Sequence, residues 1–203
     1  MVSDTRCLTP GVPQTAVSDT QCSQCEIVAT RDTEHWVSDT SFAHYFPGMG
    51  AWVVRPVRRD EFEPWTHLYR GYAAFYNWPT SDEHQRQIWG WIHDDGLVEA
   101  LVAAPVDAAG NEIGEIQGLA HLREWVRPLR GVKCGYLDDL FVDPDHRGSG
   151  VVDALYDAMR SIAAERGWPV IRWTTGDDNY RARAVYDKLA TRTMWVTYDM
   201  ATA

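Results

Sequence analysis

The sequence predicts a mixed α/β fold, with a sheet whose early strands are antiparallel, one parallel pair of strands in its middle, and helices packed against it. Two short apolar runs, at 98–104 and 113–122, flank the turn-prone stretch DAAGNE, which is typical of an antiparallel hairpin. A helical pattern then separates the apolar runs 135–142 and 170–175. A strand, a helix and a strand in so short a span form a βαβ unit, and this unit predicts the parallel pair.

The first elements of the domain are a strand and two helices. WVVRPV, at 52–57, is short and β-branched, as strands are. An aromatic side chain then recurs every three or four residues, which predicts one aromatic face on a helix. The residues of this face are Phe62, Trp65, Tyr69, Tyr72 and Tyr76. Thr80 or Ser81 can cap a second helix that ends near His93.

The second half alternates strands and helices. GYLDDLFV, at 135–142, is a strand, and the apolar stripe of the helix after Gly148 consists of Val151, Leu155, Met159 and Ile162. Gly167 and Pro169 give its stop signal. VIRWTT, at 170–175, is a buried-type strand, DDNYRARAVYDKLA a last helix, and TMWVTYDM, at 193–200, a last strand.

Residues 1–48 are rich in Ser, Thr, Asp, Gln and Pro and poor in periodic apolar runs. Such a composition buries too little surface to offset the entropy lost on ordering. The tetrapeptide VSDT occurs there three times at unequal spacings, so it does not indicate a solenoid. We therefore expect a disordered N-terminal extension at 1–48 and a single domain at 49–203.

The net charge of −10 excludes a nucleic-acid-binding protein that works by neutralising phosphates. Cationic partners fit this composition better. No basic start followed by an apolar stretch indicates a signal peptide, and no run approaches the roughly 20 apolar residues of a membrane span. The sequence thus predicts a soluble, cytoplasmic protein that binds neither nucleic acid nor membrane.

Four cysteines are present, and Cys22 and Cys25 form a CxxC pair in the extension. A tetrahedral zinc site needs four ligands, which would have to include residues as scattered as His35 and His44. Unpaired thiols are the simpler interpretation, so we predict no metal.

The stretch DPDHRGSG, at 143–150, joins the end of a strand to the start of a helix. Free backbone N–H groups and the helix dipole meet there, which favours an anion such as a pyrophosphate. Arg147 adds a fixed positive charge. A Walker loop would need a Lys, which is absent nearby, and a dinucleotide fingerprint would need a third glycine where Asp153 stands.

The turn RGSGVV, at 147–152, fits the pattern Q/R-x-x-G-x-G/A and resembles the acetyl-CoA turn of the GNAT superfamily of N-acetyltransferases. The similarity covers about residues 52–200 and includes Asn179, Ala182 and Tyr186, which are spaced as N-x-x-A-x-x-x-Y. YLDDLFVDP and NYRARAVYDKLA resemble most the histone and polyamine acetyltransferase-like branch. Two departures are Val152, in the place of a small residue, and ATRTMWV, in the place of the usual Gly-Phe.

The resemblance implies a GNAT-type, mostly antiparallel sheet with a central splayed parallel pair and helices on both faces. It also implies acetyl-CoA as the acetyl donor, with backbone groups contacting the pantetheine and an N–H near Val142 meeting the thioester carbonyl. Asn179 would hold the cofactor arm. The implied cofactor-binding residues are Leu140, Phe141, Val142, Arg147, Gly148, Ser149, Gly150, Val151, Val152 and Asn179.

Three residues are candidates for the catalytic proton transfers. The resemblance implies that Tyr186 protonates the departing thiolate, and packing in the core is the alternative role for this tyrosine. Asp138 and Asp139 are candidate bases, because burial can raise the pKa of an acid on such a strand. Neighbours in a strand face opposite sides of a sheet, so we expect at most one of them to face the acceptor. The alternative is that both acids are solvated or paired with Arg172 or Arg130.

Two other features give weaker candidates. Cys134 could be a nucleophile, but it has no evident His partner, and we discount it. The aromatic face of the first helix, with Trp78, Trp89 and Trp91 close in sequence, could form a cage for a cationic acceptor, although most of these rings are expected in the core.

These observations predict an enzyme that transfers acetyl from acetyl-CoA to a primary amine by direct attack in a ternary complex. The acidic composition favours a cationic acceptor, such as a polyamine, an aminoglycoside-like compound or a lysine side chain. A non-catalytic acyl-CoA-binding sensor or regulator is the alternative. The sequence leaves open a longer acyl donor and a homodimer.

Overall fold

The computed structural model describes residues 44–45 and 52–202, which all belong to the compact unit Asp39–Ala203. Most of the predicted extension lies outside the described residues, and so do the VSDT repeats, the CxxC pair and His35. His44 and Tyr45, within the predicted extension, form a short strand.

The described strands form one six-stranded sheet in chain order. They are β1 (His44–Tyr45), β2 (Trp52–Pro56), β3 (Glu99–Pro105), β4 (Gly118–Arg127), β5 (Val132–Val142) and β6 (Ile171–Arg172). Every neighbouring pair is antiparallel except β5 and β6, which are parallel. The predicted mixed sheet with one parallel pair is therefore confirmed, but this pair lies at the edge of the described sheet and not in its middle, because no strand follows β6 in residues 173–202.

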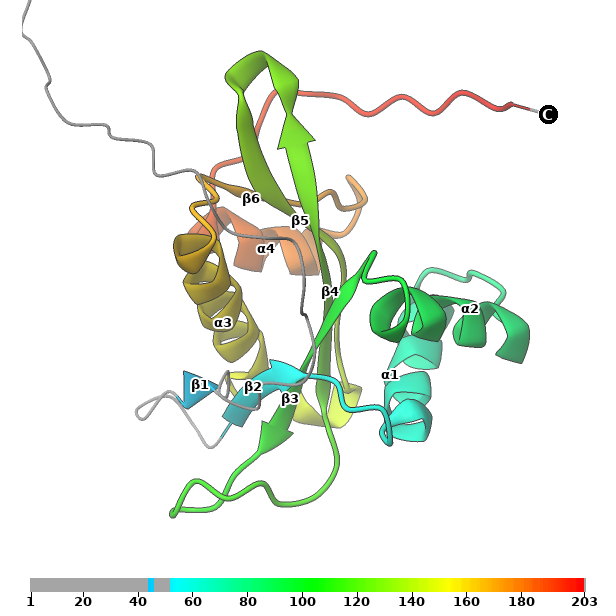
Figure 1. Cartoon of the computed structure of the whole chain (residues 1–203), viewed down its shortest axis with the longest axis vertical. Coiled ribbons are helices and arrows are strands. Elements are labelled where there is room, and N and C mark those ends of the chain that lie inside the picture. The colour runs from blue at the N-terminus through cyan, green and yellow to red at the C-terminus, as the bar shows by residue number, and fades with distance from the viewer. Residues whose placement is uncertain (1–43, 46–51, 203) are drawn as a thin grey trace, which may run out of the picture. The chain divides into compact units, whose positions relative to one another are not determined.

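Two helical layers cover the sheet, one on each face (Figure 1). On one face lie α1 (Phe62–Phe75) and α2 (Asp82–His93), and on the other lie α3 (Val151–Glu165) and α4 (Tyr180–Leu189). The 3-10 helices η2 (Pro128–Arg130) and η3 (Pro144–His146) lie in the connections. Each face has its own apolar cluster, because side chains alternate between the faces along each strand. No helix in the described part of the chain is both long and apolar enough to cross a bilayer.

The helix boundaries follow the chemistry of the caps. Ser81 accepts a hydrogen bond from the backbone N–H of His84, so it caps α2 as predicted. Gly167 has a φ of 66°, a left-handed conformation that suits glycine, and it ends α3.

One extra residue interrupts the pairing of β4 with β5. His121 pairs with Asp139 and Leu122 pairs with Leu137, which leaves Asp138 without a partner. This is a β-bulge, and it breaks the regular alternation of side chains.

The predicted last strand at 193–200 is absent. Residues 190–202 have no regular secondary structure, and their large apolar side chains are exposed, with Met194 at 96% and Tyr198 at 88%. A strand needs a partner of matching length, whereas β6, at the edge of the sheet, has only two residues.

A buried ion cluster ties the start of α1 to the sheet. Arg55 of β2 is 7% exposed and makes paired hydrogen bonds of 2.6–2.9 Å to Glu61, which precedes α1, and to Glu112, which follows β3. Arg58 also donates to Glu112. Hydrogen bonds from Arg55 lower the pKa of Glu112 to about 2, against the opposing effect of burial.

We predict that Glu112→Gln lowers the free energy of unfolding near neutral pH by about 1–3 kcal/mol, because Arg55 loses one of its two carboxylates. A carboxyl whose pKa is lowered on folding stabilises the fold above its unfolded pKa, and this effect is lost as the pH falls towards about 2. The difference between the variant and the wild type should therefore shrink in urea unfolding at about pH 3.

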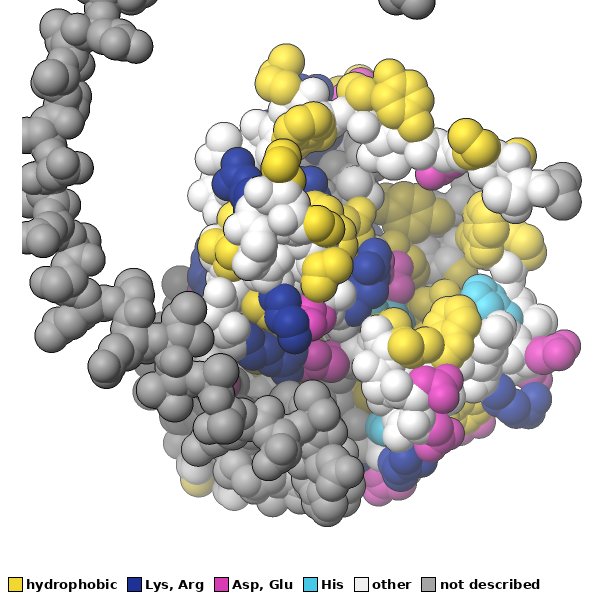
Figure 2. Space-filling model, turned by 45° about the horizontal axis from the view of Figure 1, so that its top comes forward, with side chains coloured by type: hydrophobic (Ala, Val, Ile, Leu, Met, Phe, Trp, Pro, Cys, Tyr) yellow, Lys and Arg dark blue, Asp and Glu magenta, His cyan; other side chains and the backbone are white. Residues whose placement is uncertain are grey.

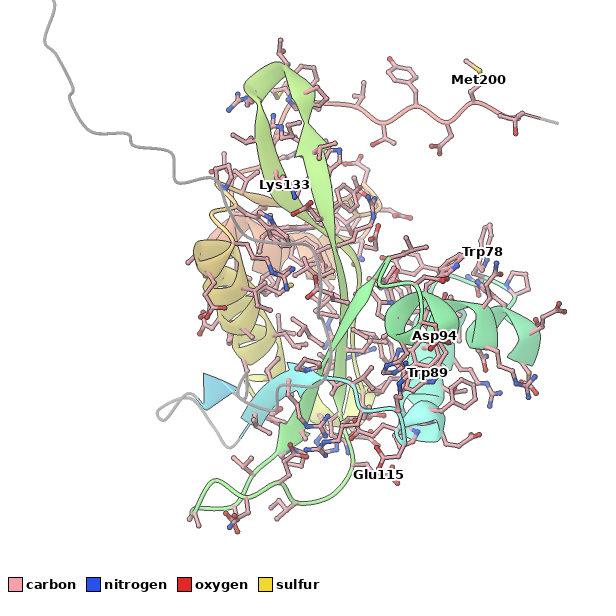
Figure 3. All side chains as sticks on the ribbon, in the orientation of Figure 1. Trp78, Trp89, Asp94, Glu115, Lys133 and Met200 are labelled. Atoms are coloured by element: carbon pink, nitrogen blue, oxygen red, sulfur yellow. The ribbon has the colours of Figure 1, made fainter. Side chains whose placement is uncertain are left out.

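Glu115→Gln is the matched control, because Glu115 is exposed and forms no ion pair with another described residue (Figure 3). A difference that stays constant between the two pH values would contradict the role of the Glu112 charge.

Candidate active site

The glycine turn connects the end of η3, at His146, to the start of α3, at Val151. Gly148 and Gly150 have φ values of 82° and 93°, which L side chains rarely adopt. Gly150 is the N-cap of α3, and no side chain caps this helix. In the part of the chain that the structure describes, the N–H groups of residues 148–153 donate to no protein acceptor. These free donors at a helix N-terminus form an anion-binding cradle.

Two contacts fix the backbone of this turn. The Trp52 indole N–H donates to the Ser149 carbonyl at 3.0 Å, and the Ser149 hydroxyl donates to the His146 carbonyl at 2.6 Å. Val152 packs against the apolar cluster under α3, so its side chain points away from the cradle. The residues present therefore fit a pyrophosphate.

Arg147 lies beside the turn and is exposed. Its Nε donates to the Val142 carbonyl at 3.2 Å, and its guanidinium stands 5.6 Å from the Phe141 ring centroid. The positive charge is thereby held between the end of β5 and the turn, where it can pair with a phosphate.

Tyr186 lies on α4, on the same face of the sheet as the turn. Its ring packs edge-on against Trp173, with 5.4 Å between the ring centroids. Burial, and then the neighbouring Tyr76, raise the pKa of Tyr186, so its hydroxyl keeps its proton near neutral pH. Asn179 caps α4 by accepting from the Ala182 N–H at 3.2 Å, and its predicted contact with the cofactor stays a prediction.

β5 and β6 separate beyond a short paired stretch. They pair at Gly135 with Ile171 and at Tyr136 with Arg172, and no further pairs follow. The ladder between β5 and β6 thus leaves an opening after two residues, and Tyr76, at the end of α1, lies close enough to Tyr186 of α4 to contribute to its raised pKa. The splayed parallel pair is thus confirmed.

Asp138 and Asp139 lie on the same face of the sheet, the one that α1 covers. Asp139 contacts His121, which is hydrogen-bonded to Trp65 of α1. Asp138 accepts a hydrogen bond from Arg123 Nε at 2.8 Å. Leu122 points to the α3 face, so its neighbour Arg123 points to the α1 face, and Asp138 lies there with it. The prediction that the two acids face opposite sides is therefore wrong, because the bulge breaks the alternation. The alternative named Arg172 or Arg130 as a partner, whereas Asp138 pairs with Arg123.

His121 is 2% exposed and holds Asp139 in place. An indole N–H can only donate, so the 3.0 Å bond from Trp65 makes His121 Nε2 the acceptor. The proton of the neutral ring then lies on Nδ1, which donates to Asp139 Oδ2 at 2.7 Å. Protonation of Nε2 would break the bond from Trp65, so the pair consists of a neutral imidazole and a carboxylate.

The two carboxylates have pKa values displaced in opposite directions. Burial, helped by the Asp139 charge, raises the pKa of Asp138 despite the hydrogen bond from Arg123. Burial also opposes ionisation of Asp139, but hydrogen bonding to His121 and Tyr72 outweighs it and lowers the pKa. Such a divergence is typical of a site with separate acid–base and charge-holding roles.

Tyrosines of α1 form a wall beside Asp139. Ring centroids lie 6.3 Å apart between Tyr69 and Tyr72, and 5.1 Å apart between Tyr72 and Tyr76. Burial and the Asp139 charge raise the pKa of Tyr69 to about 12 and that of Tyr72 further. The wall and the carboxylate together suit an amine.

The predicted tryptophan cage does not form. Trp78 is 68% exposed, whereas Trp89 packs against Trp65 and Phe62, and Figure 3 shows Trp78 and Trp89 well apart. Cys134 is fully buried in β5, as expected of a residue with no catalytic role.

Sequence reasoning missed three residues of this site, Trp52, His121 and Arg123. The alternation within β4 could have indicated that His121 is buried, but the bulge that sets its partner leaves no sequence signal of its own.

Comparisons with known proteins agree with this geometry. The model of the acetyltransferase (GNAT) family matches residues 54–190. The D-amino-acid N-acetyltransferase HPA3 of Saccharomyces cerevisiae is 29% identical over 147 residues, which cover 72% of this chain and 88% of the yeast protein.

Two solved structures share the fold. The ribosomal-protein-alanine N-acetyltransferase from Brucella melitensis is 23% identical, with a TM-score of 0.60 over 75% of this chain and 100% of the other. AAC(6')-Iy, solved with a CoA bisubstrate analogue, is 18% identical, with a TM-score of 0.62 over 75% and 99%. The chain belongs to the acetyltransferase (GNAT) family and is an N-acetyltransferase that takes its acetyl group from acetyl-CoA.

Proposed function

We propose that this enzyme acetylates a small primary amine by direct attack in a ternary complex. The observation that carries the proposal is the opening between β5 and β6, with the anion cradle and Tyr186 on one face and the paired carboxylates on the other. The acetyl donor and the acceptor can then approach the opening from opposite faces. The yeast relative, a D-amino-acid N-acetyltransferase by name, supports a small-molecule acceptor.

Several groups of this chain would contact the donor. The free N–H groups of 148–153 and Arg147 would hold the pyrophosphate. Leu140–Val142 pair with β4 on one side only, and the backbone edge that β6 leaves unpaired would hold the pantetheine. Asn179 would border the cofactor arm. Acetyl-CoA supplies an activated thioester, and the protein supplies position and proton transfers.

The two carboxylates have different roles towards the amine. Asp139, held ionised by His121, binds the acceptor as an ammonium. Asp138 takes the proton on Oδ1, since Oδ2 holds Arg123, and leaves the nitrogen lone pair free to attack. As the new N–C bond forms and the C–S bond breaks, Tyr186 Oη protonates the sulfur. The nitrogen gives up its second proton to solvent, and Tyr186 regains its proton from solvent.

The alternative, a non-catalytic acyl-CoA sensor, is not favoured by a site that retains both carboxylates and Tyr186. Membership of the histone and polyamine branch stays a prediction, and so does the homodimer.

We predict that Tyr186→Phe lowers kcat about 100-fold, because the departing thiolate loses its proton donor. The measurement is thiol release from acetyl-CoA with polyamines, amino acids, aminoglycosides and a basic peptide. Tyr180→Phe is the control, since Tyr180 lies on the same helix and is 74% exposed. Acetyl-CoA binding without turnover on any amine would contradict the proposed activity.

We predict that Trp52→Phe weakens CoA binding about fivefold, because the turn loses a hydrogen bond of about 1 kcal/mol. Isothermal titration calorimetry with CoA measures this change. Trp168→Phe is a matched control, since Trp168 lies in the same apolar cluster and its buried indole nitrogen has no hydrogen-bond partner among the described residues. Equal weakening in both variants would show that only core packing was lost.

A further inference from the structure

A cavity of about 320 Å³ lies on the same face of the sheet as the two carboxylates. Arg123 and Trp125 of β4, Tyr136 of β5 and Arg172 of β6 line it from the sheet, and Trp195 lines it from the C-terminal segment. Figure 2 shows the molecule hollowed between this segment and the α1–α2 layer, with hydrophobic side chains in the hollow.

Two guanidinium groups flank the floor of the cavity. In the strand register, Tyr136 of β5 lies opposite Arg123 of β4 on one side and Arg172 of β6 on the other. The three side chains therefore form one row across the sheet. Arg123 stands 4.6 Å from the Tyr136 ring centroid, and Arg172 stands 4.8 Å from the Trp125 ring centroid. Stacking on rings fixes a guanidinium but leaves its edge donors free for a ligand.

The charges around the cavity are unbalanced. Its lining contains two arginines, three threonines and no carboxylate, in a chain whose net charge is −10. Arg123 shares its charge with Asp138, whereas Arg172 forms no ion pair with another described residue. Arg127, which also stacks on Trp125, adds a third positive charge nearby. The cavity therefore favours an anionic group.

The arrangement places a cationic subsite and an anionic subsite side by side. Arg123 joins them, because it lines the cavity and also holds Asp138. A ligand that reaches from the carboxylates to Arg172 must carry a positive group and a negative group a short distance apart. An α-amino acid has this chemistry, whereas a polyamine has only positive groups.

We propose that Arg172, with Arg123, binds the carboxylate of the acceptor, and that the acceptor is an amino acid with an apolar or aromatic side chain. This inference rests on the proposed function. The amino group meets Asp138 and Asp139, the carboxylate meets the guanidinium edges above Tyr136, and the side chain lies against Trp125 and Trp195. The expectation of a purely cationic acceptor came from the overall charge, which says nothing about one cavity.

The test compares acceptors that differ only in the carboxylate. Phenylalanine, as both enantiomers, phenylalaninamide and phenethylamine are assayed by thiol release with the full-length protein. We expect kcat/KM to be highest for one of the two amino acids. Arg172→Met should lower the ratio of kcat/KM for the amino acid to that for phenethylamine about 10- to 100-fold. Arg172→Lys should restore part of the ratio, since it keeps the charge.

A binding measurement supports the assay without requiring turnover. N-acetylphenylalanine should bind the wild type in the presence of CoA by calorimetry and bind Arg172→Met at least about tenfold more weakly. Arg160→Met is the control, because Arg160 lies on α3, on the other face, and pairs only with Asp157 among the described residues.

The outcomes separate this inference from the proposed function. Equal or better turnover of phenethylamine, or an unchanged ratio in Arg172→Met, would overturn the carboxylate site and leave the amine acetyltransferase intact. If none of the amines caused thiol release, both the carboxylate site and the proposed function would be overturned.

Discussion

β5 carries one residue more than β4 where the two strands pair beside α1, and the acid–base roles proposed for Asp138 and Asp139 depend on that bulge. Without it, Asp138 and Asp139 would face opposite layers, and one of them would be buried under α3. With it, the two carboxylates lie on one face, where His121 holds one and Arg123 the other. Two acids so close interact, and their pKa values move apart.

Because β5 and β6 pair over only two residues, the sheet separates two layers but leaves a gap between these strands. The anion cradle, Trp173 and Tyr186 lie on the α3 and α4 face, and the carboxylates and the arginine row lie on the α1 and α2 face. A donor and an acceptor can meet there without sharing a pocket, which accounts for the different composition of the two sides. The proposed carboxylate site would let a strongly acidic chain bind an anion, since recognition depends on a few oriented groups and not on net charge.

Patterns with a local cause predicted most of the fold. The caps at Ser81 and Gly167, the antiparallel pairing of β3 with β4 and the glycine turn all follow from residues close in sequence. Long-range features were harder to predict. The bulge at Asp138 depends on the register between two strands, and the strand expected at 193–200 had the right alternation but no partner of sufficient length. Trp52 is far in sequence from the turn that it holds, so no spacing rule could reveal it.

The most direct test of this account is a titration of the two carboxyl groups by carbon-13 NMR, with assignment from the Asp138→Asn and Asp139→Asn variants. We predict that Asp138 titrates above the ordinary aspartate value of about 3.9 and Asp139 below it. The Asp139→Asn variant should lower the pKa of Asp138, because a neighbouring negative charge is removed. Two ordinary and independent titrations would contradict the account, since they would place the acids apart, as on an uninterrupted strand.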